Sequence, residues 1–528
     1  MENLFERSLK DPSVMTVTWE LVPGRGAREK AQESVLLEAE KAARGGKIQA
    51  VSVTDNPGGQ PALMADSLAC EIKALGIEPL VHFTCKDKNR SQIESQLYAL
   101  ERAGVRNLLV MSGDYPVSGF MGRPQPVFDL DPTHVLALIR DMNSGLEYPL
   151  PKGTGRLQPG HFFAGAAVSP FKQTEAELLG QYYKLKKKID CGASFVVTQL
   201  GYDIRKFQEV LLYMKRRGIE VPVLGNVYIL SYPVARLMKE NRLPGCVVTD
   251  GLMAQLDRER SLPDKGVEAR LLRAAKMYAL LKGLGFSGAH IGGHLVTCEQ
   301  VESVIEKGEE LSASWETLIR EFQYPLPGGF YFFQEDPYRK LNQSAPESRQ
   351  GLSSDVSEKG LYGFSIFLHN LFFEPGRKGF ALMRLFARKL KGTRLENFLH
   401  KLEHLLKTLL YDCRDCGDCA LVDVAFLCPM SQCPKQQRNG PCGGSYQGWC
   451  EVYPGRRRCI YVRAYSRLKS RHQENLLEEI PVAPCNWDLN SSSAWLNFFL
   501  GKDHTAKRLG ISELPDKPES SGSNSRSA

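Results

Sequence analysis

The sequence predicts an α/β protein, a (β/α)8 TIM barrel followed by a small cysteine-rich metal-binding domain. Eight short apolar or β-branched runs alternate with helical patterns between residues 14 and 291. Each run ends in polar or small residues, which is typical of parallel strands that open onto a site. Beyond the last run, nine of the 14 cysteines lie between Cys413 and Cys485.

The expected strands are 14–20, 50–53, 79–83, 108–111, 162–168, 195–197, 221–224 and 289–291. The expected helices are 28–44, 62–75, 91–103, 133–143, 175–190, 204–217, 233–239 and 267–282. Strict alternation predicts parallel strands joined by helical crossovers, and eight such units fit a closed barrel better than an open doubly wound sheet. The Pro- and Gly-rich stretch 149–160 is expected to be a long loop.

Composition narrows the class of protein. Hydrophobic residues make up 42% and charged residues 24%, which is ordinary for a soluble globular chain, and the net charge of +8 is spread over 528 residues. The basic runs 186–188 and 456–458 are short and lack interleaved aromatic residues, so nucleic-acid binding is not predicted. The N-terminus is charged where a signal peptide would be apolar, and the sequence contains no apolar run long enough to span a bilayer. We expect a cytoplasmic protein.

In a barrel the carboxyl ends of the strands meet around one mouth. The polar residues at the expected strand ends are Glu20, Thr54, His82, Asp114, Ser169, Gln199, Asn226 and His290. Each of them alone could cap a turn, and this applies especially to Asp114 after the buried run 108–111. Together, two carboxylates, two imidazoles and two amides predict a site for a polar heterocyclic ligand.

Four segments around these residues resemble the methylenetetrahydrofolate reductases, a family of flavin-dependent (β/α)8 barrels. They are WELVPG around Glu20, HFTCKDKN from His82, SGDYP around Asp114 and KKKIDCGASFVVTQLGYD from Lys186. The resemblance covers about residues 14–300. It implies reduction of 5,10-methylenetetrahydrofolate to 5-methyltetrahydrofolate, a step of one-carbon metabolism.

Carried over by position, the resemblance implies roles for individual residues. Glu20 would be the general acid, and burial among apolar neighbours would raise its pKa for that task. Asp114 would lie beside the flavin and the pterin, and Gln199 would bind the folate. The other residues expected to line the flavin are Thr54, His82, Lys188 and Ala193.

Some family positions differ here. Ser112 stands where the family usually has Arg, Ser169-Pro170 replaces Tyr-Pro, and the last strand reads HIGGHL. The resemblance therefore implies FAD, with FMN as the alternative. Two other functions stay open: a corrinoid-linked methyl-folate methyltransferase, and a non-catalytic electron-carrier or scaffold subunit.

The cysteine cluster begins with C-x2-C-x2-C, the spacing of a cubane iron–sulfur site, and continues with two Cys-Pro pairs. The expected metal ligands are Cys413, Cys416, Cys419, Cys428, Cys433, Cys442, Cys450 and Cys459. Eight thiolates suffice for two [4Fe-4S] clusters, and zinc is the alternative metal. Cys485 is expected to be a structural thiol. The cluster resembles the cysteine-rich partner domain of some methylenetetrahydrofolate reductases.

The fused cysteine module predicts that electrons come from a partner protein, ferredoxin-like or a redox complex, rather than from NADH or NADPH directly. The domains expected are the barrel (1–310), a linker and helical connection (311–410), the cysteine-rich domain (411–510) and a disordered tail (511–528). The sequence does not predict an oligomeric state.

Overall fold

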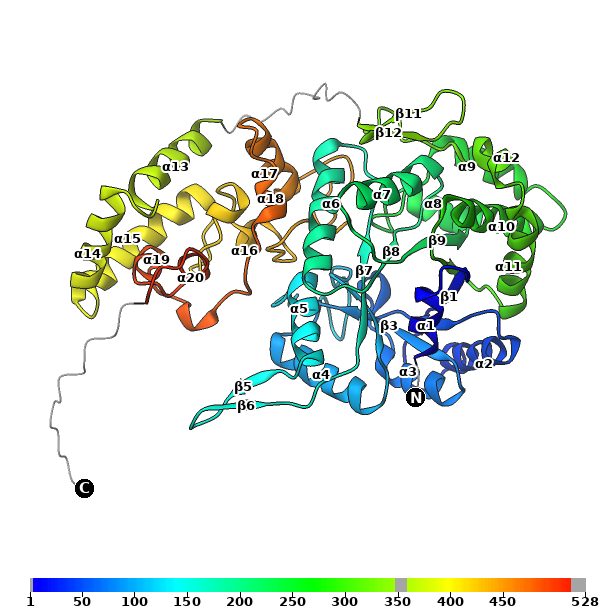
Figure 1. Cartoon of the computed structure of the whole chain (residues 1–528), viewed down its shortest axis with the longest axis horizontal. Coiled ribbons are helices and arrows are strands. Elements are labelled where there is room, and N and C mark those ends of the chain that lie inside the picture. Colours follow the sequence, from blue (N-terminus) through cyan, green and yellow to red (C-terminus); the bar gives the residue numbers. More distant parts are fainter. Residues whose placement is uncertain (1–2, 347–358, 514–528) are drawn as a thin grey trace. The chain divides into compact units, whose positions relative to one another are not determined.

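A computed structural model describes residues 3–346 and 359–513 (Figure 1). The chain divides into two compact units. One, the barrel unit, contains Met1–Asp355 and Cys433–Pro481, and the other, the helical unit, contains Val356–Gln432 and Val482–Ala528. The expected boundary at residue 411 differs from this division, because the cysteine-rich stretch contributes to both units. Residues 514–528 of the expected tail and 347–358 of the expected linker lie outside the described residues, whereas Ile511 is buried in the core of the helical unit.

Eight parallel strands close into a barrel in the order β1-β10-β9-β8-β7-β4-β3-β2, so the predicted (β/α)8 barrel is confirmed. The strands are β1 (Thr16–Leu21), β2 (Ala50–Val53), β3 (Glu78–Thr84), β4 (Asn107–Met111), β7 (Phe163–Val168), β8 (Phe195–Thr198), β9 (Val223–Ile229) and β10 (Gly288–Gly293). All of them lie within three residues of an expected start, because their apolar runs are short and well bounded.

Helices follow the strands as expected: α2 (Lys30–Gly45), α3 (Ala65–Ala74), α4 (Arg90–Arg102), α5 (Pro132–Asn143), α6 (Glu175–Asp190), α7 (Ile204–Arg216), α8 (Tyr232–Lys239) and α10 (Val267–Leu284). Several begin at side-chain caps; Thr174 and Glu177, for example, form a capping box at the start of α6. The chain adds α9 (Asp250–Glu259), α11 (Cys298–Ser312), α12 (Trp315–Leu318) and the short turns η1 (Pro57–Gly59) and η2 (Ile319–Phe322).

The amino-terminal end of the barrel is closed by α1 (Leu4–Lys10), which the sequence analysis did not predict. Phe5 and Leu9 are buried in the barrel core with residues from β3, β4, β7 and β8. The Phe5 ring packs edge-on against Phe163 and Phe195. This end is therefore filled, and the polar strand ends lie at the opposite end.

Two short hairpins modify the expected loops. Strands β5 (Glu147–Pro149) and β6 (Thr154–Arg156) form a hairpin in the stretch expected to be a loop, and it extends away from the barrel (Figure 1). Strands β11 (Phe333–Glu335) and β12 (Asn342–Pro346) lie in the expected linker. Arg205 on α7 pairs with Glu335 at 2.8 Å and donates to Asn342 at 3.1 Å, so this hairpin belongs to the barrel unit.

The second segment of the barrel unit, residues 433–481, carries α17 (Ile460–Lys469) and α18 (Leu476–Glu479). Helix α17 packs on α6. Tyr465 donates a hydrogen bond to Glu175 at 2.9 Å, and Lys469 pairs with the same carboxylate. A segment more than 130 residues beyond the last barrel strand thus forms part of the barrel's wall.

The helical unit contains α13 (Lys359–Phe372), α14 (Lys378–Leu390), α15 (Arg394–Tyr411), η3 (Val422–Val424), α16 (Pro429–Gln432), η4 (Trp487–Leu489), α19 (Ala494–Phe499) and α20 (His504–Arg508). Its core joins the inner face of α14 to α19 through Phe380, Leu390 and Phe499. His504 bridges Asp418 at 2.6 Å and Asp423 at 2.8 Å, which ties α20 to the cysteine-rich loop. No helix in the described ranges has both the length and the apolarity needed to cross a membrane.

Candidate active site and thiol sites

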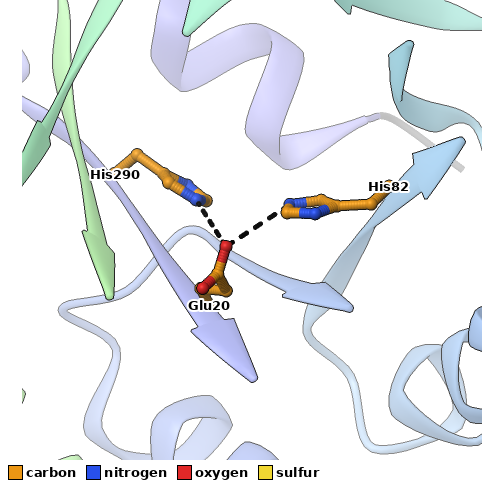
Figure 2. A group of neighbouring side chains, drawn as sticks. All are labelled: Glu20, His82 and His290. Carbon is orange, nitrogen blue, oxygen red and sulfur yellow. Dashed lines mark ion pairs between the residues drawn. The ribbon is translucent and has the colours of Figure 1, made fainter. Parts of the chain in front are cut away.

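Three residues from different strands meet at the barrel mouth: Glu20 on β1, His82 on β3 and His290 on β10 (Figure 2). The Glu20 Oε2 atom lies 3.6 Å from Nε2 of His290 and 4.0 Å from Nε2 of His82. The other ring nitrogen of His290, Nδ1, is hydrogen-bonded to Thr18 Oγ1 at 2.7 Å. The register of β1 against β10 pairs Thr18 with His290, so neighbouring strands fix the imidazole toward Glu20.

The two histidines change the acidity expected of Glu20. Burial raises the carboxyl's pKa, but the interaction with His290 and the attraction of both imidazoles outweigh it, so the Glu20 pKa is lowered. The expectation of a raised pKa is therefore wrong for the protein without ligand. Burial lowers the pKa of His82 to about 4, which keeps that ring neutral at physiological pH.

Glu20, His82 and His290 also form the one group among the described residues in which three or more His, Cys, Asp or Glu ligand atoms all lie within 4.8 Å. Two imidazoles and a carboxylate can hold a divalent cation. They can equally hold and exchange a proton. The geometry alone permits both uses.

Several buried polar atoms without a hydrogen-bond partner lie on the barrel strands or directly after them. They are Ser52 Oγ, Thr54 Oγ1, His82 Nε2, Ser169 Oγ and Asn226 Oδ1. The strand register pairs Ser52 with Glu20 and Asn226 with His290, so these side chains belong to the same layers of the barrel. Buried polar groups in proteins are almost always hydrogen-bonded. Their concentration here fits a polar ligand that satisfies them.

Other predicted residues lie at the same mouth with local partners. Asp114 is half-buried, and its Oδ2 accepts a hydrogen bond from the Gly58 N–H at 2.7 Å, which ties the loop after β4 to the loop after β2. Gln199 follows β8, and its Oε1 accepts from the Leu200 N–H at 2.8 Å. The amide nitrogen of Gln199 and one carboxylate oxygen of Asp114 therefore remain for a ligand.

Lys188 and Ala193 are both buried, and Lys188 has a backbone partner near the end of β7. Lys188 is 8% exposed on α6 and donates to the Ala167 carbonyl at 2.6 Å. Burial, the largest cause, and the positive charge of Lys184 lower the Lys188 pKa to about 7. Ala193 is 4% exposed and precedes β8, so it lies on the side of that strand away from the mouth.

Four of the predicted metal ligands belong to the barrel unit. We call Cys433, Cys442, Cys450 and Cys459 the barrel thiols. Each thiol accepts a hydrogen bond from at least one backbone N–H, for example Cys433 from Gln437 and Cys442 from Gly444. Burial raises the pKa of Cys433 to about 12, so thiolates need a compensating positive charge to form there.

Residues around the barrel thiols bind the barrel mouth directly. Lys435 donates to the Gly113 carbonyl at 2.7 Å, one residue before Asp114. Gln437 accepts hydrogen bonds from Ser112 at 2.9 Å and from Lys184 at 2.7 Å. Lys172 donates to the Ser445 carbonyl at 2.7 Å. The sequence analysis missed these contacts because they join positions more than 250 residues apart.

The other four predicted ligands, Cys413, Cys416, Cys419 and Cys428, lie in the helical unit and line one small pocket. We call them the helical-unit thiols. Lys407 at the end of α15 donates to Cys419 Sγ at 3.5 Å, and Asp415 donates its N–H to Cys413 Sγ at 3.4 Å. Cys485 is buried in one cluster with Cys416 and Cys428, and its structural role stays a prediction.

The spacing of the thiols bears on the metal that they would hold. A tetrahedral zinc site brings four sulfurs to within about 3.8 Å of one another. Among the described residues, neither set has three sulfurs that all lie within 4.8 Å. Thiols with backbone N–H donors can serve zinc or a metal–sulfur cluster, so both metals stay open at these sites.

Comparison with known proteins gives two family matches. The family described as "Methylenetetrahydrofolate reductase" matches residues 5–306, and "Methylene-tetrahydrofolate reductase C terminal" matches residues 393–488. The chain is similar to "Methylenetetrahydrofolate reductase 2" of Saccharomyces cerevisiae, with 27% identity over 200 residues, 36% of this chain and 30% of that protein. It is similar to "5,10-methylenetetrahydrofolate reductase" of Pectobacterium carotovorum, with 24% identity over 30% of this chain and 45% of that protein.

The chain thus spans less than half the length of these two relatives. A solved structure, titled "Uncharacterized protein from Clostridium thermocellum binds two copies of 5-methyl-5,6,7,8-tetrahydrofolic acid", has a TM-score of 0.41 and 12% identity. The match covers 59% of this chain and 99% of that one. A likeness at that level carries no argument about function.

Proposed function

Because the chain belongs to the methylenetetrahydrofolate reductase family, we propose that it reduces 5,10-methylenetetrahydrofolate to 5-methyltetrahydrofolate with a bound flavin. The observation that carries the proposal is the Glu20, His82 and His290 group at the barrel mouth, together with the unpartnered buried polar atoms on the barrel strands or directly after them. A filled amino-terminal end and a polar carboxyl end support binding at this one mouth.

The residues at the mouth fit a flavin ring. A planar heterocycle with several carbonyl and N–H groups would satisfy the unpartnered atoms of Thr54, His82 and Asn226. When bound, the flavin supplies hydride to the carbon that is reduced. The protein's task is then to place the folate, hold a proton near its ring nitrogen and exclude water.

Glu20 and His290 would handle the proton. Opening the folate's bridging ring needs an acid near a tertiary amine, and a carboxylate with a lowered pKa donates poorly at neutral pH. A folate that covers the mouth would desolvate Glu20 further and raise its pKa. His290, fixed by Thr18, would pass the proton to Glu20 through Nε2. Asp114 and Gln199 would bind the pterin.

The flavin proposed is FAD, with FMN as the alternative. Lys188 and Ala193, which the family resemblance assigns to the flavin, are buried and have backbone partners. The segment from Gln437 to Gly440 contacts α6 beside them through Lys184.

The two thiol sets would each hold one metal–sulfur cluster, which when bound supplies single-electron transfer. For the barrel thiols, the backbone N–H donors and the contact of Lys435 with Gly113 support a site beside the flavin. A partner protein would then deliver electrons to the helical-unit thiols. This source of electrons rests on the thiol chemistry alone.

The first experiment is anaerobic purification followed by an absorbance spectrum, iron and zinc analysis, and mass identification of any released flavin. We expect FAD, iron at two clusters per chain, and 5-methyltetrahydrofolate formation with a reduced low-potential donor. A colourless protein without flavin that still moves a methyl group to a corrinoid would instead support the methyltransferase. A colourless and inactive protein would support a scaffold.

A further inference from the structure

The helices α13, α14 and α15 carry a second apolar face that the helical unit does not use for its own core. Of the 31 large apolar side chains that are exposed among the described residues, thirteen lie between Phe364 and Leu410, a range that is less than a tenth of the chain. On α15 they include Leu395, Phe398, Leu402, Leu405, Leu406, Leu409 and Leu410. Most of them repeat at intervals of three and four residues, so they form a continuous outward stripe.

The opposite faces of these helices are already buried. Phe380, Ala387 and Leu390 of α14 pack into the core with α19, whereas Leu382 and Leu385 point outward with 65% and 59% exposure. On α15, Glu403 and Lys407 form a buried ion pair at 2.8 Å on the inner side. Folding of the unit therefore does not explain the outward leucines and phenylalanines, and a patch of this kind marks an interaction surface.

The same stretch has a strong excess of exposed positive charge. Between residues 374 and 411 the exposed cations are Arg377, Lys378, Arg388, Lys389, Arg394 and Lys401. The single exposed carboxylate in that range is Glu374. Lys389 lies one turn beyond Phe386 and two turns beyond Leu382, so cations and apolar side chains share one face of α14. Apolar and cationic groups on one helical face suit an anionic lipid surface.

A cavity of about 340 Å³ opens beside this face. Phe364, Leu406 and Leu410 belong both to its wall and to the outward face, and Phe426, Trp495 and Phe498 line it further. Its apolar lining fits a hydrocarbon chain.

We propose that the outward face of α13–α15 binds the surface of an anionic membrane, with the cavity receiving one apolar chain from it. The helices would lie in the interface and not span it, in line with the absence of a spanning helix from the described ranges. A coiled-coil partner would cover only the α15 stripe, which extends over fewer than three heptads. An anionic lipid surface, in contrast, would contact the apolar side chains of all three helices and would also attract the cations on the same face.

The test is co-sedimentation of the purified full chain with vesicles of phosphatidylcholine alone or with one quarter phosphatidylglycerol. We expect binding to the anionic vesicles to be at least about tenfold tighter than to the neutral ones, because several cations contribute, and to weaken with salt. The triple variant Leu385→Gln, Leu402→Gln, Leu409→Gln should lose binding at least about tenfold, because burial of these side chains drives insertion. Their exposure makes misfolding unexpected, and circular dichroism would confirm a retained fold.

The matched control is Phe120→Gln with Leu295→Gln, two apolar residues of the barrel unit that are 95% and 86% exposed. It should bind vesicles like the original protein. The absence of vesicle binding, or binding that the triple variant leaves unchanged, would overturn the proposal. So would a dimer that the triple variant dissociates in a protein without vesicle affinity, because the face would then join two copies. Neither result depends on folate turnover.

Discussion

The two units each contain four of the predicted cysteine ligands, but their surroundings differ. The barrel thiols lie in a segment fixed to the mouth by Lys435 and Gln437, next to Asp114. The helical-unit thiols lie at the end of α15, where Lys407 contacts Cys419, and Cys419 also lines the apolar cavity. The barrel thiols are all half-buried, whereas Cys416 and Cys428 of the helical unit are buried. The same type of side chain thus has different neighbours and a different exposure in the two units.

The largest expected effect concerns the barrel unit alone. Glu20→Gln should reduce folate turnover by about 10²–10⁴ with every electron source, because it removes the proton-holding carboxylate. Steady-state assays would measure the rate, and absorbance would show that the flavin is retained. Unchanged folate turnover in this variant would remove Glu20 from the mechanism and with it the chemical role of this mouth.

The second effect separates the two thiol sets. Cys416→Ser should lower turnover driven by a reduced donor protein at least about tenfold and halve the iron content, because cluster ligation needs its thiolate. Dithionite-driven turnover should remain. The control is Cys70→Ser, an exposed thiol outside both sets. If Cys416→Ser lowered donor-driven and dithionite-driven turnover equally, the proposal that the helical-unit thiols receive electrons from the donor would be incorrect.

A third variant weakens the attachment of the barrel thiols. Gln437→Ala should cost about 2 kcal/mol of unfolding free energy, because it leaves the buried Ser112 hydroxyl and the Lys184 ammonium short of an acceptor. Urea titration would measure it. The exposed Gln473→Ala, in the same segment, should stay within about 0.5 kcal/mol of the original. Equal free energies of unfolding for Gln437→Ala and Gln473→Ala would show that the hydrogen bonds of Gln437 do not hold this segment firmly on the barrel.

The smallest effect belongs to the helical unit. Burial raises the pKa of Asp503 to about 6, so the folded chain binds this proton more tightly than the unfolded chain does. The stability supplied by the protonated form is present below about pH 4 and is lost as pH rises to 6. Asp503→Asn, which keeps the cap on Ala506, should therefore stabilise the unit by about 2 kcal/mol at pH 7.5 and little at pH 4.

Urea unfolding at the two pH values, followed by circular dichroism, would measure that difference. The exposed Asp488→Asn serves as the control. A stabilisation of equal size at both pH values would mean that Asp503 is not destabilised by its charge.

The barrel could be predicted from the sequence because strand and helix periodicities are local and repeat eight times. Helix α1 was missed because its seven residues are too few to show a period. The lowered pKa of Glu20 could not be foreseen, since it depends on His290, which arrives from a strand 270 residues away. The C-x2-C-x2-C spacing suggested a cluster but not the division of eight cysteines, because that division depends on contacts such as that of Lys435 with Gly113.

The path of the backbone between the two units limits how the chain can be cleaved or truncated into independent domains. The chain passes from one unit to the other three times, after Asp355, after Gln432 and after Pro481. One cut at the first passage would leave the units covalently joined. A deletion of residues 411–510 would remove the segment that packs on α6 together with the cysteines, and a gene fragment ending at residue 310 would encode a closed barrel with the outer surface of α6 uncovered. Neither the barrel segment 1–310 nor the cysteine-rich stretch 411–510 is therefore an independent module. Loss or exchange of the cysteine-rich stretch would require further substitutions on the barrel surface that it covers.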